Sequence, residues 1–150
     1  LEPMTESDFQ SRLDFMITDY AQENVKAGYW TEEEAQQKSS ETFQRLLPDG
    51  TATANHYLYT IRDGETKESV GLLWLFAQGS KGFIYGIMID QDRRRHGYGE
   101  AAMLALEAEG QKIGVTQIGL HVFAHNPAAL KLYQKIGYQF KSYNMVKDLE

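Results

Sequence analysis

The 150-residue sequence contains no cysteine. Disulfide bonds, cysteine-ligated zinc and a thiol nucleophile are therefore excluded. The sequence also lacks an apolar run of about 20 residues, which a membrane-spanning helix requires. A basic segment followed by an apolar one, the pattern of a signal peptide, is missing as well. These absences predict a cytoplasmic protein that does not contact membranes.

Positive charge is scarce: 15 Lys and Arg stand against 21 Asp and Glu, which gives a net charge of −6. This balance disfavours a nucleic-acid-binding surface and suits cationic substrates such as amines. The hydrophobic fraction of 42% and the aromatic fraction of 12% are typical of a folded globular chain. The length predicts a single domain over residues 1–150 that buries one core.

The spacing of apolar residues predicts the secondary structure. Intervals of three and four residues indicate helices, and alternation indicates strands. The predicted elements, in chain order, are helices 5–26 and 31–47, strands 56–62, 69–77 and 83–89, helix 100–113, strand 116–123, helix 126–136, and a bent strand or hairpin over 138–148. The three consecutive strands are expected to form an antiparallel meander, because their connections are too short for crossovers. Strand 116–123 is expected to lie parallel to strand 83–89.

A loop rich in arginine and glycine, residues 93–100, separates strand 83–89 from the helix that follows. The start of a helix carries unpaired backbone N–H groups and the positive end of the helix dipole, so it favours an anion such as phosphate. Gly97 and Gly99 allow a ligand to approach the backbone closely, and either is compatible with a positive φ. Arg93, Arg94 and Arg95 add cationic donors. The loop is therefore the first candidate binding site.

Two families use such a loop. Gly97-Tyr98-Gly99-Glu100-Ala101-Ala102 fits the dinucleotide-binding pattern G-x-G-x-x-G/A. That pattern requires an acidic residue about 20 positions further on, at the end of the next strand. The next predicted strand carries His121 and no carboxylate, and too little sequence remains for a doubly wound sheet. In the other register, Arg94-x-x-Gly97-x-Gly99 resembles the Gln/Arg-x-x-Gly-x-Gly/Ala signature of the GCN5-related N-acetyltransferases (GNAT).

A second segment supports this resemblance. Residues 120–138 are similar to the GNAT pattern L-x-V-x-x-x-N-x-x-A-x-x-L-Y-x-x-x-G-F, with Tyr138 in place of the final Phe. The order of the predicted elements is also that of the family, if one strand is missing at the N-terminus. The resemblance covers about residues 57–138. It implies the GNAT fold, an α/β (α+β) arrangement in which a mixed, mostly antiparallel sheet has helices on both faces and a splayed central pair of strands.

The resemblance also implies acetyl-CoA as co-substrate, with no metal and no covalent intermediate. Backbone N–H groups of residues 95–100 would hold the pyrophosphate. A bulge would splay strand 83–89 from strand 116–123, so that Ile87 and Ile89 could bond the pantetheine amides. The cofactor-binding residues implied in this way are Ile87, Met88, Ile89, Arg94, Arg95, His96, Gly97, Tyr98, Gly99, Glu100, Asn126 and Tyr133.

The catalytic residues that the resemblance implies are Tyr133 and His121. Tyr133 would donate a proton to the departing thiolate, since a phenol with a pKa of about 10 is a suitable acid for a thiolate whose conjugate pKa is about 8.5. Many GNAT enzymes place a glutamate base on the strand before the loop, but residues 83–88 contain no acid. His121 titrates in a suitable range for base work. Tyr85 or an ordered water stays open as an alternative.

The acceptor expected is a primary amine, on a small molecule or on a protein or peptide. Five aromatic residues are candidates either for its pocket or for the core: Tyr29, Trp30, Tyr57, Tyr59 and Trp74. Asn126 likewise has two interpretations, a helix cap and a contact to the pantetheine arm. Two alternative functions stay open, a module that binds acyl-CoA without turning it over and, less favoured, a dinucleotide enzyme. A homodimer is also left open.

Overall fold

The computed structural model describes residues 1–149 and arranges five strands in one sheet, in the order β1-β2-β3-β4-β5. The strands are β1 (Glu2–Pro3), β2 (His56–Arg62), β3 (Ser69–Gln78), β4 (Lys81–Ile89) and β5 (Gln117–Leu120). Strands β1 to β4 are antiparallel to their neighbours, whereas β5 runs parallel to β4. This is the mixed, mostly antiparallel sheet that the sequence predicts.

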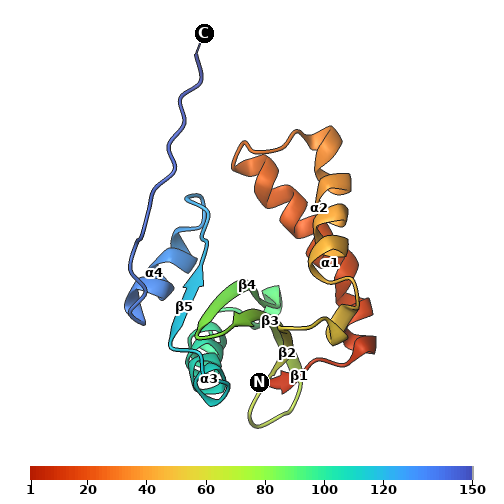
Figure 1. The fold of residues 1–150 in the computed structure, drawn as a ribbon, viewed down its shortest axis with the longest axis vertical. Helices are drawn as coiled ribbons and strands as arrows, with labels where there is room; N and C mark the ends of the chain where they lie inside the picture. Colours follow the sequence, from red (N-terminus) through yellow and green to blue (C-terminus); the bar gives the residue numbers. More distant parts are fainter. Residues whose placement is uncertain (150) are drawn as a thin grey trace.

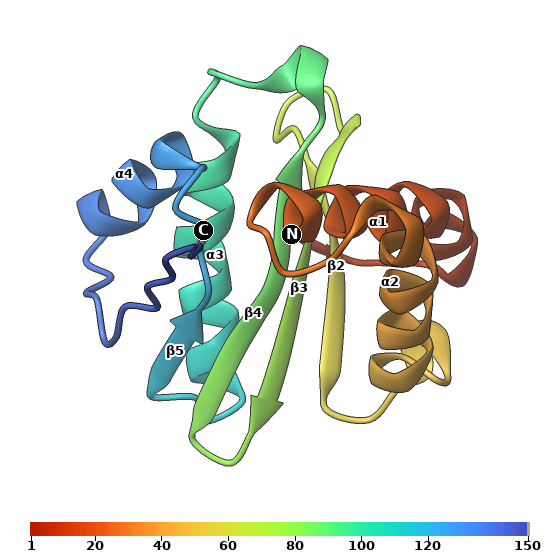
Figure 2. The same cartoon turned by 90° about the horizontal axis from the view of Figure 1, so that it is seen from above.

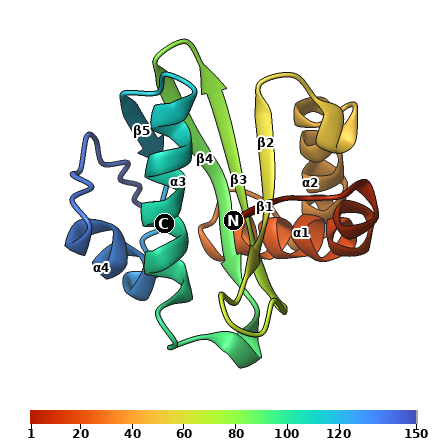
Figure 3. The same cartoon turned by 90° about the horizontal axis from the view of Figure 1, so that it is seen from below.

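Helices cover both faces of this sheet (Figure 1). They are α1 (Glu6–Lys26), α2 (Glu32–Leu46), α3 (Tyr98–Lys112) and α4 (Pro127–Lys135), with short 3-10 turns η1 (Gly50–Ala52) and η2 (Gln91–Arg93). Figure 2 shows α1 and α2 in front of the sheet, and the opposite view in Figure 3 shows α3 in front of β4 and β5. The predicted start of α1 is confirmed by Thr5, whose hydroxyl accepts the N–H of Asp8 at 3.1 Å.

The core lies on both sides of β3. Leu73 and Leu75 pack with Met103 and Leu106 of α3 on one face. On the other face Leu72 and Trp74 pack with side chains of α1 and α2, including Met16 and Phe43. A strand covered on both faces has apolar residues at nearly every position, which is why residues 70–75 form a continuous apolar run. Complete burial of one such side chain contributes about 1.5–3 kcal/mol to stability.

Both ends of the chain differ from the prediction. The expected missing N-terminal strand is present as β1, where Glu2 pairs with Thr60 and Pro3 with Tyr59. Two residues are too few for an alternating pattern to be detected. The bent strand or hairpin predicted over 138–148 was wrong, because residues 138–149 have no regular secondary structure. A strand requires a neighbouring strand to bond, and this segment extends away from the sheet (Figure 1).

Strand β5 is also shorter than predicted, since it ends at Leu120 and not at Phe123, and α3 begins two residues earlier than predicted, at Tyr98. The early end of β5 matters for function, because it defines where the two parallel strands part. Within residues 1–149, none of the helices is both long and apolar enough to cross a membrane.

Candidate active site

A β-bulge at Tyr85 opens the sheet between β4 and β5. In the ladder between β3 and β4, Trp74 pairs with Gly86 and Leu75 pairs with Ile84, so Tyr85 is the extra residue. The parallel ladder between β4 and β5 ends at the same place, with the pair Ile84 and Leu120. A bulge bends its strand and increases the local twist. Strand β4 therefore continues beyond the bulge without β5 beside it, and the splayed pair of strands is confirmed.

The register shows which backbone groups this opening exposes. The N–H of Asp90 donates to the carbonyl of Val70 at 2.8 Å. In an antiparallel pair alternate residues bond the neighbouring strand, so Ile87 and Ile89 direct their backbone groups away from β3, toward the side that β5 has left. Arg94 Nε donates to the carbonyl oxygen of Ile89 at 3.1 Å. Ile87 thus presents both a backbone donor and a backbone acceptor at the opening.

The loop after β4 leads into α3, whose N-terminus has no side-chain cap among the described residues. Arg95 and Gly97 have φ angles of +67° and +80°, and Gly97 is the N-cap of α3 without a side-chain hydrogen bond among the described residues. The first helical bond runs from the N–H of Ala101 to the carbonyl of Gly97, at 3.1 Å. The N–H groups of residues 98–100 precede it and have no helical acceptor. Unpaired N–H groups at the positive end of a helix dipole are suited to an anion.

The two glycines of this loop have different roles. A Cβ added at Gly97 would meet no heavy atom within 4 Å, so the positive φ is what requires glycine there. Gly99 is an ordinary helical residue, and a Cβ added to it would lie 3.4 Å from Leu132 Cδ2. The prediction that a glycine in this loop takes a positive φ is therefore confirmed for Gly97, whereas at Gly99 a Cβ would make only an ordinary contact with α4.

Side chains of the loop are tied to the hairpin between β2 and β3. Arg93 Nη2 lies 2.6 Å from Glu68 Oε2, and the Tyr98 hydroxyl donates a hydrogen bond to Asp63. The hydrogen bond from Tyr98, together with those from the backbone N–H groups of Thr66 and Glu65, holds the pKa of Asp63 well below its usual range. The same bond to Asp63 raises the pKa of Tyr98. The hydroxyl hydrogen of Tyr98 is thus bonded to Asp63, which leaves only its backbone N–H to donate to a phosphate. The guanidinium of Arg93 is likewise paired with Glu68.

A second tie fixes the end of β4 to α1. Arg12 donates from both terminal nitrogens to the Asp90 carboxylate, at 3.0 and 3.3 Å, and one of them also reaches Ser69 Oγ at 2.9 Å. A bidentate guanidinium–carboxylate pair restricts orientation as well as distance. Arg94, Arg95 and His96 stay exposed at the surface of the loop. Glu100 carries the opposite charge there and pairs with Lys135 at 2.9 Å.

Tyr133 lies on α4, partly buried against the core cluster beneath α3, which Ile87 and Ile89 also contact. Burial raises the pKa of Tyr133. Asn126 accepts the N–H of Ala129 through its side-chain oxygen at 3.2 Å, so it caps α4. The same face of the core therefore receives the inward side of α4 and the splayed part of β4. Met88 points to the other face, where it packs against the cluster of α1 and α2.

The candidate bases His121 and Tyr85 both lie where the strands part. His121 directly follows the end of β5 and contacts the ring of Phe123 edge-on, with centroids 4.9 Å apart. Tyr85 is the bulged residue and is 41% exposed, with its ring 4.9 Å from that of Trp74. Both side chains are accessible, and both come from strands that line the opening.

Three polar residues beside these strands were not predicted. His125 Nε2 and Glu23 Oε2 are 2.6 Å apart and join α1 to the segment after β5. Burial opposes the ionisation of Glu23, but the bonds to His125 and Lys26 lower its pKa. Burial and the charge of Glu23 raise the pKa of Asp19, one turn earlier. In the sequence, Asp19 and Glu23 lie four residues apart beside the apolar face of α1. No pattern in the neighbouring residues predicts that either contacts His125.

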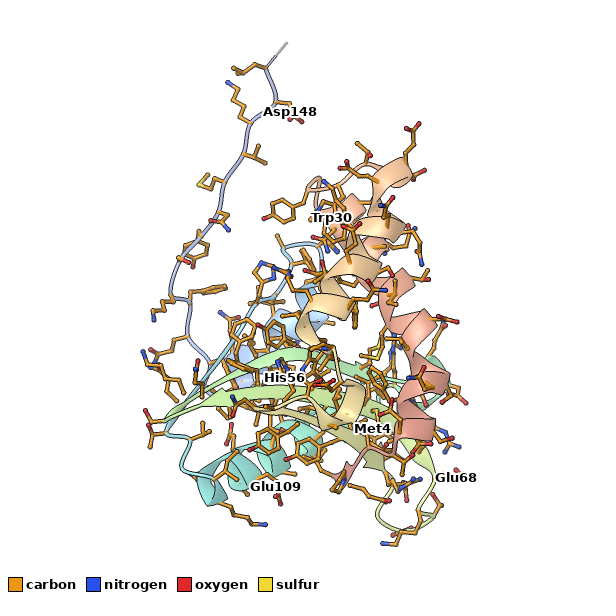
Figure 4. The ribbon with its side chains drawn as sticks, turned by 45° about the vertical axis from the view of Figure 1, so that its right-hand side comes forward. Met4, Trp30, His56, Glu68, Glu109 and Asp148 are labelled. Atoms are coloured by element: carbon orange, nitrogen blue, oxygen red, sulfur yellow. The ribbon has the colours of Figure 1, made fainter. Side chains whose placement is uncertain are left out.

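The five aromatic residues considered for an acceptor pocket are not brought together. Trp74 is buried under α1 and α2 and donates its indole N–H to His56 Nδ1 at 2.9 Å. Tyr59 packs on the opposite core cluster. Tyr29 lies instead near Phe123, with ring centroids 6.5 Å apart, and so approaches the end of β5. Figure 4 shows Trp30 at the outer end of the α1–α2 pair and His56 on the sheet, well separated.

These features define a class of protein. An open strand beside an uncapped helix offers unpaired backbone groups that suit a ligand with phosphates at one end and amide groups along its arm. The family model described as the acetyltransferase (GNAT) family matches residues 17–138. The chain belongs to this family.

Two curated relatives come from Bacillus subtilis (strain 168). The chain is 39% identical to the uncharacterized N-acetyltransferase YycN and 35% identical to the uncharacterized N-acetyltransferase YdgE, in each case over 99% of this chain and 97% of the relative. The crystal structure of the putative acetyltransferase YycN superimposes with a TM-score of 0.95 at 38% identity, covering 100% of this chain and 98% of that one. A mutant of the BH1408 protein from Bacillus halodurans shares the fold alone, with a TM-score of 0.74 at 19% identity and coverage of 99% and 98%.

Proposed function

We propose that this protein transfers an acetyl group from acetyl-CoA to a primary amine by direct attack. One observation carries the proposal: three features follow one another along the unpaired part of β4. They are the bulge at Tyr85, the end of strand pairing at Ile84 and Leu120, and the uncapped start of α3. Membership in the acetyltransferase family and two relatives named N-acetyltransferases support it.

The residues at this edge fit the parts of acetyl-CoA. The backbone N–H groups of residues 98–100 suit the pyrophosphate, and Arg94 and Arg95 add positive charge beside it. Ile87 suits the pantetheine arm, because an amide chain laid along β4 can bond its N–H and carbonyl as a neighbouring strand would. Bound acetyl-CoA supplies the activated acyl carbon and a thiolate leaving group.

Tyr133 and His121 would move the protons of this reaction. The amine nitrogen forms a bond to the carbonyl carbon, and the carbon–sulfur bond breaks. Burial keeps the Tyr133 hydroxyl protonated, so it is available to protonate the departing thiolate. The attacking amine must first lose a proton from its ammonium form. His121 is the proposed acceptor of that proton, with Tyr85 or a water as the alternative.

The acceptor is a cationic amine, on a small molecule or a peptide. Asp19 and Glu23 of α1 support this choice. Glu23 bonds His125 in the segment that follows β5, and Asp19, one turn earlier, is within range of the charge of Arg94. Negative charge at this position raises the local concentration of an ammonium ion.

Thiol release from acetyl-CoA across a panel of amines tests the proposal. The absence of cysteine leaves no protein thiol to contribute background. We expect amine-dependent release, and we expect acetyl-CoA to raise the melting temperature while NAD and ATP do not. Stabilisation without release for any amine would favour a module that binds acyl-CoA without turnover, an alternative that the absence of an acid from residues 83–88 also favours. Equal stabilisation by NAD would favour a dinucleotide enzyme.

The substitution Tyr133→Phe tests the proton donor. It keeps the ring and its packing and removes the hydroxyl, so kcat should fall by about 10²–10⁴-fold with CoA affinity little changed. Tyr138→Phe is the matched control. Its ring lies 6.1 Å from that of Tyr133, and burial raises its pKa as well, to about 12. Full turnover in folded Tyr133→Phe protein would remove Tyr133 from the mechanism.

A further inference from the structure

Three aromatic side chains on the sheet lie outside the core. Phe76 of β3 and Phe83 and Tyr85 of β4 pack on one another, with the ring centroid of Tyr85 5.1 Å from that of Phe83 and 6.2 Å from that of Phe76. Neither of the two core clusters among residues 1–149 includes them. Tyr85 is 41% exposed, and the other two rings are partly exposed. We call these three residues the aromatic floor.

The aromatic floor lies on the face of the sheet that carries α1 and α2. Leu72 and Trp74 pack against these helices, and alternation along β3 directs Phe76 to the same face. The ring of Tyr85 lies 4.9 Å from that of Trp74. Figure 2 shows none of the helices of residues 1–149 in front of the ends of β3 and β4 that join at their shared turn. The helices therefore leave the floor accessible.

A row of aligned residues extends the floor across the sheet. The register pairs His56 of β2 with Phe76, and Phe76 with Phe83. The ring of His56 lies 4.8 Å from that of Phe76. Because His56 Nδ1 accepts the indole N–H of Trp74, its Nε2 carries the hydrogen of the neutral ring. Burial lowers the pKa of His56. The row is therefore uncharged at neutral pH and does not repel a cation.

The aromatic floor ends at the opening between β4 and β5. Tyr85 is the bulged residue, and pairing with β5 ends one residue before it, at Ile84. Gly86 follows, and it pairs with Trp74, so it faces the same side as the floor. A Cβ added to Gly86 would meet no heavy atom within 4 Å. Free space beside Tyr85 thus adjoins both the floor and the opening.

We propose that the acceptor is a primary amine joined by a short alkyl chain to a flat aromatic ring, and that the aromatic floor binds this ring. The inference rests on the proposed acetyl transfer, which puts the thioester at the opening beside Tyr85. Two residues of a strand span about 6–7 Å, so a short chain would place the ring over Phe83 and Phe76. Aromatic rings gain from offset or edge-to-face contact beyond the area that they bury. The net charge of −6 favours the ammonium end.

Initial rates with two matched amines test the proposal. 2-Phenylethylamine and 2-cyclohexylethylamine have the same linker, but only the first has a flat aromatic ring. At saturating acetyl-CoA, we expect kcat/KM to be roughly 3–10-fold higher for 2-phenylethylamine. Acetylation of both amines with equal kcat/KM, or a preference for the cyclohexyl compound, would overturn the aromatic acceptor and leave acetyl transfer intact.

The substitution Phe83→Leu tests the floor itself, because it removes the ring and keeps an apolar side chain. The preference for 2-phenylethylamine should be lost through a higher KM for that amine, with the KM for acetyl-CoA unchanged. Phe76→Leu should act in the same way and serves as a second variant if Phe83→Leu does not fold. Comparing each variant with the parent on both amines cancels the difference in their basicity. An unchanged preference in folded variants would overturn the proposal.

The control is Tyr57→Leu, which removes a ring from the opposite face of the same sheet. Tyr57 is 37% exposed and pairs with Leu75, which packs in the cluster under α3. This variant should keep the preference of the parent for 2-phenylethylamine. A loss equal to that of Phe83→Leu would show that the effect is not specific to the floor, and would count against it.

Binding without turnover separates the floor from the proposed reaction. The chain has two tryptophans, so Trp30→Phe leaves only Trp74, whose ring contacts Tyr85. In the presence of CoA, which carries no acetyl group, 2-phenylethylamine should change the emission of Trp74 saturably, and more weakly in Phe83→Leu. Such binding by a protein that acetylates no amine would contradict acetyl transfer and support the floor. Acetylation of 2-phenylethylamine without this signal would support the transfer and overturn the floor.

Discussion

Arg94 Nε donates a hydrogen bond to the carbonyl oxygen of Ile89, at 3.1 Å. The bond joins the loop to the splayed part of β4, so an arginine expected to face phosphate lies along the strand expected to face pantetheine. The carbonyl of Ile89 is a ladder acceptor beyond the end of β5. In the proposed complex, the phosphates of CoA would compete with the carbonyl of Ile89 for the guanidinium of Arg94.

The substitution Arg94→Ala should separate these two roles. Removing a charged donor to phosphate costs about 1.5–3 kcal/mol, so the Kd for CoA should rise roughly 10–100-fold. Pantetheine carries no phosphate, and its affinity should stay unchanged or improve, because the carbonyl of Ile89 is released. Isothermal titration with both ligands measures the difference. An equal loss for both ligands would show that Arg94 acts by holding β4 in place.

Replacing Gly97 should block the anion site. Gly97→Val forces a β-branched residue to a φ of +80° and projects its side chain into open space in front of the loop. The left-handed conformation costs about 1–2 kcal/mol, and we expect CoA affinity to fall more than about tenfold. Gly114→Val is the control, since Gly114 follows the other end of α3, with a φ of +89° and no heavy atom within 4 Å of an added Cβ. CoA titrations in which Gly97→Val binds like Gly114→Val would show that the loop is only a turn.

Gly71 supports the splayed strand from behind. It pairs with Ile89, and a Cβ added there would lie 2.1 Å from the carbonyl oxygen of Met88. Gly71→Ala should therefore shift β4 and lower the free energy of unfolding by about 1–3 kcal/mol. Gly86→Ala, on the next strand, adds a methyl group with no heavy atom within 4 Å and should retain the stability of the parent. Urea unfolding compares them; a Gly71→Ala protein as stable as Gly86→Ala would contradict this packing.

The free energy of unfolding should depend on pH through the ionisation of Asp63. The hydroxyl of Tyr98 and the N–H groups of Thr66 and Glu65 depress its pKa in the folded state, whereas the unfolded value is about 3.9. Below that pH the unfolded state binds more protons than the folded state, so stability is complete above about pH 4 and is lost as the pH falls further.

The substitution Asp63→Asn removes this ionisation. The variant should be less stable than the parent at neutral pH, and it should lose less of its free energy of unfolding between about pH 5 and pH 2.5. Asp14→Asn, on the exposed side of α1, removes an equal charge and should keep the acid dependence of the parent. Denaturant titrations across this range decide. An unchanged pH profile in Asp63→Asn would mean that the bond from Tyr98 contributes nothing.

Much of the fold could be predicted from the sequence because its signals are local. Alternation places the meander strands, Thr5 and Asn126 mark helix starts, and Gly97 marks the positive φ of the loop. The helix start after an arginine- and glycine-rich loop predicts an anion site before any coordinates are considered. The splay of β4 and β5 was implied by the resemblance only, since no residue of β4 indicates that Tyr85 forms the β-bulge.

The remainder depends on contacts between distant segments. The pair of Glu23 and His125 joins residues more than a hundred positions apart, and periodicity carries no information about such a partner. The bent strand or hairpin predicted over 138–148 is absent for the same reason, because a strand forms only where another strand pairs with it, and local sequence does not show whether one does.

The most direct test of the account is hydrogen exchange of backbone amides with and without acetyl-CoA. If the cofactor lies along β4 with its phosphates at the start of α3, the amides of Ile87, Tyr98, Gly99 and Glu100 should exchange more slowly when it is bound, and those of α2 should not change. Saturating acetyl-CoA that leaves these four amides unprotected, or that protects a different surface, would contradict the central claim.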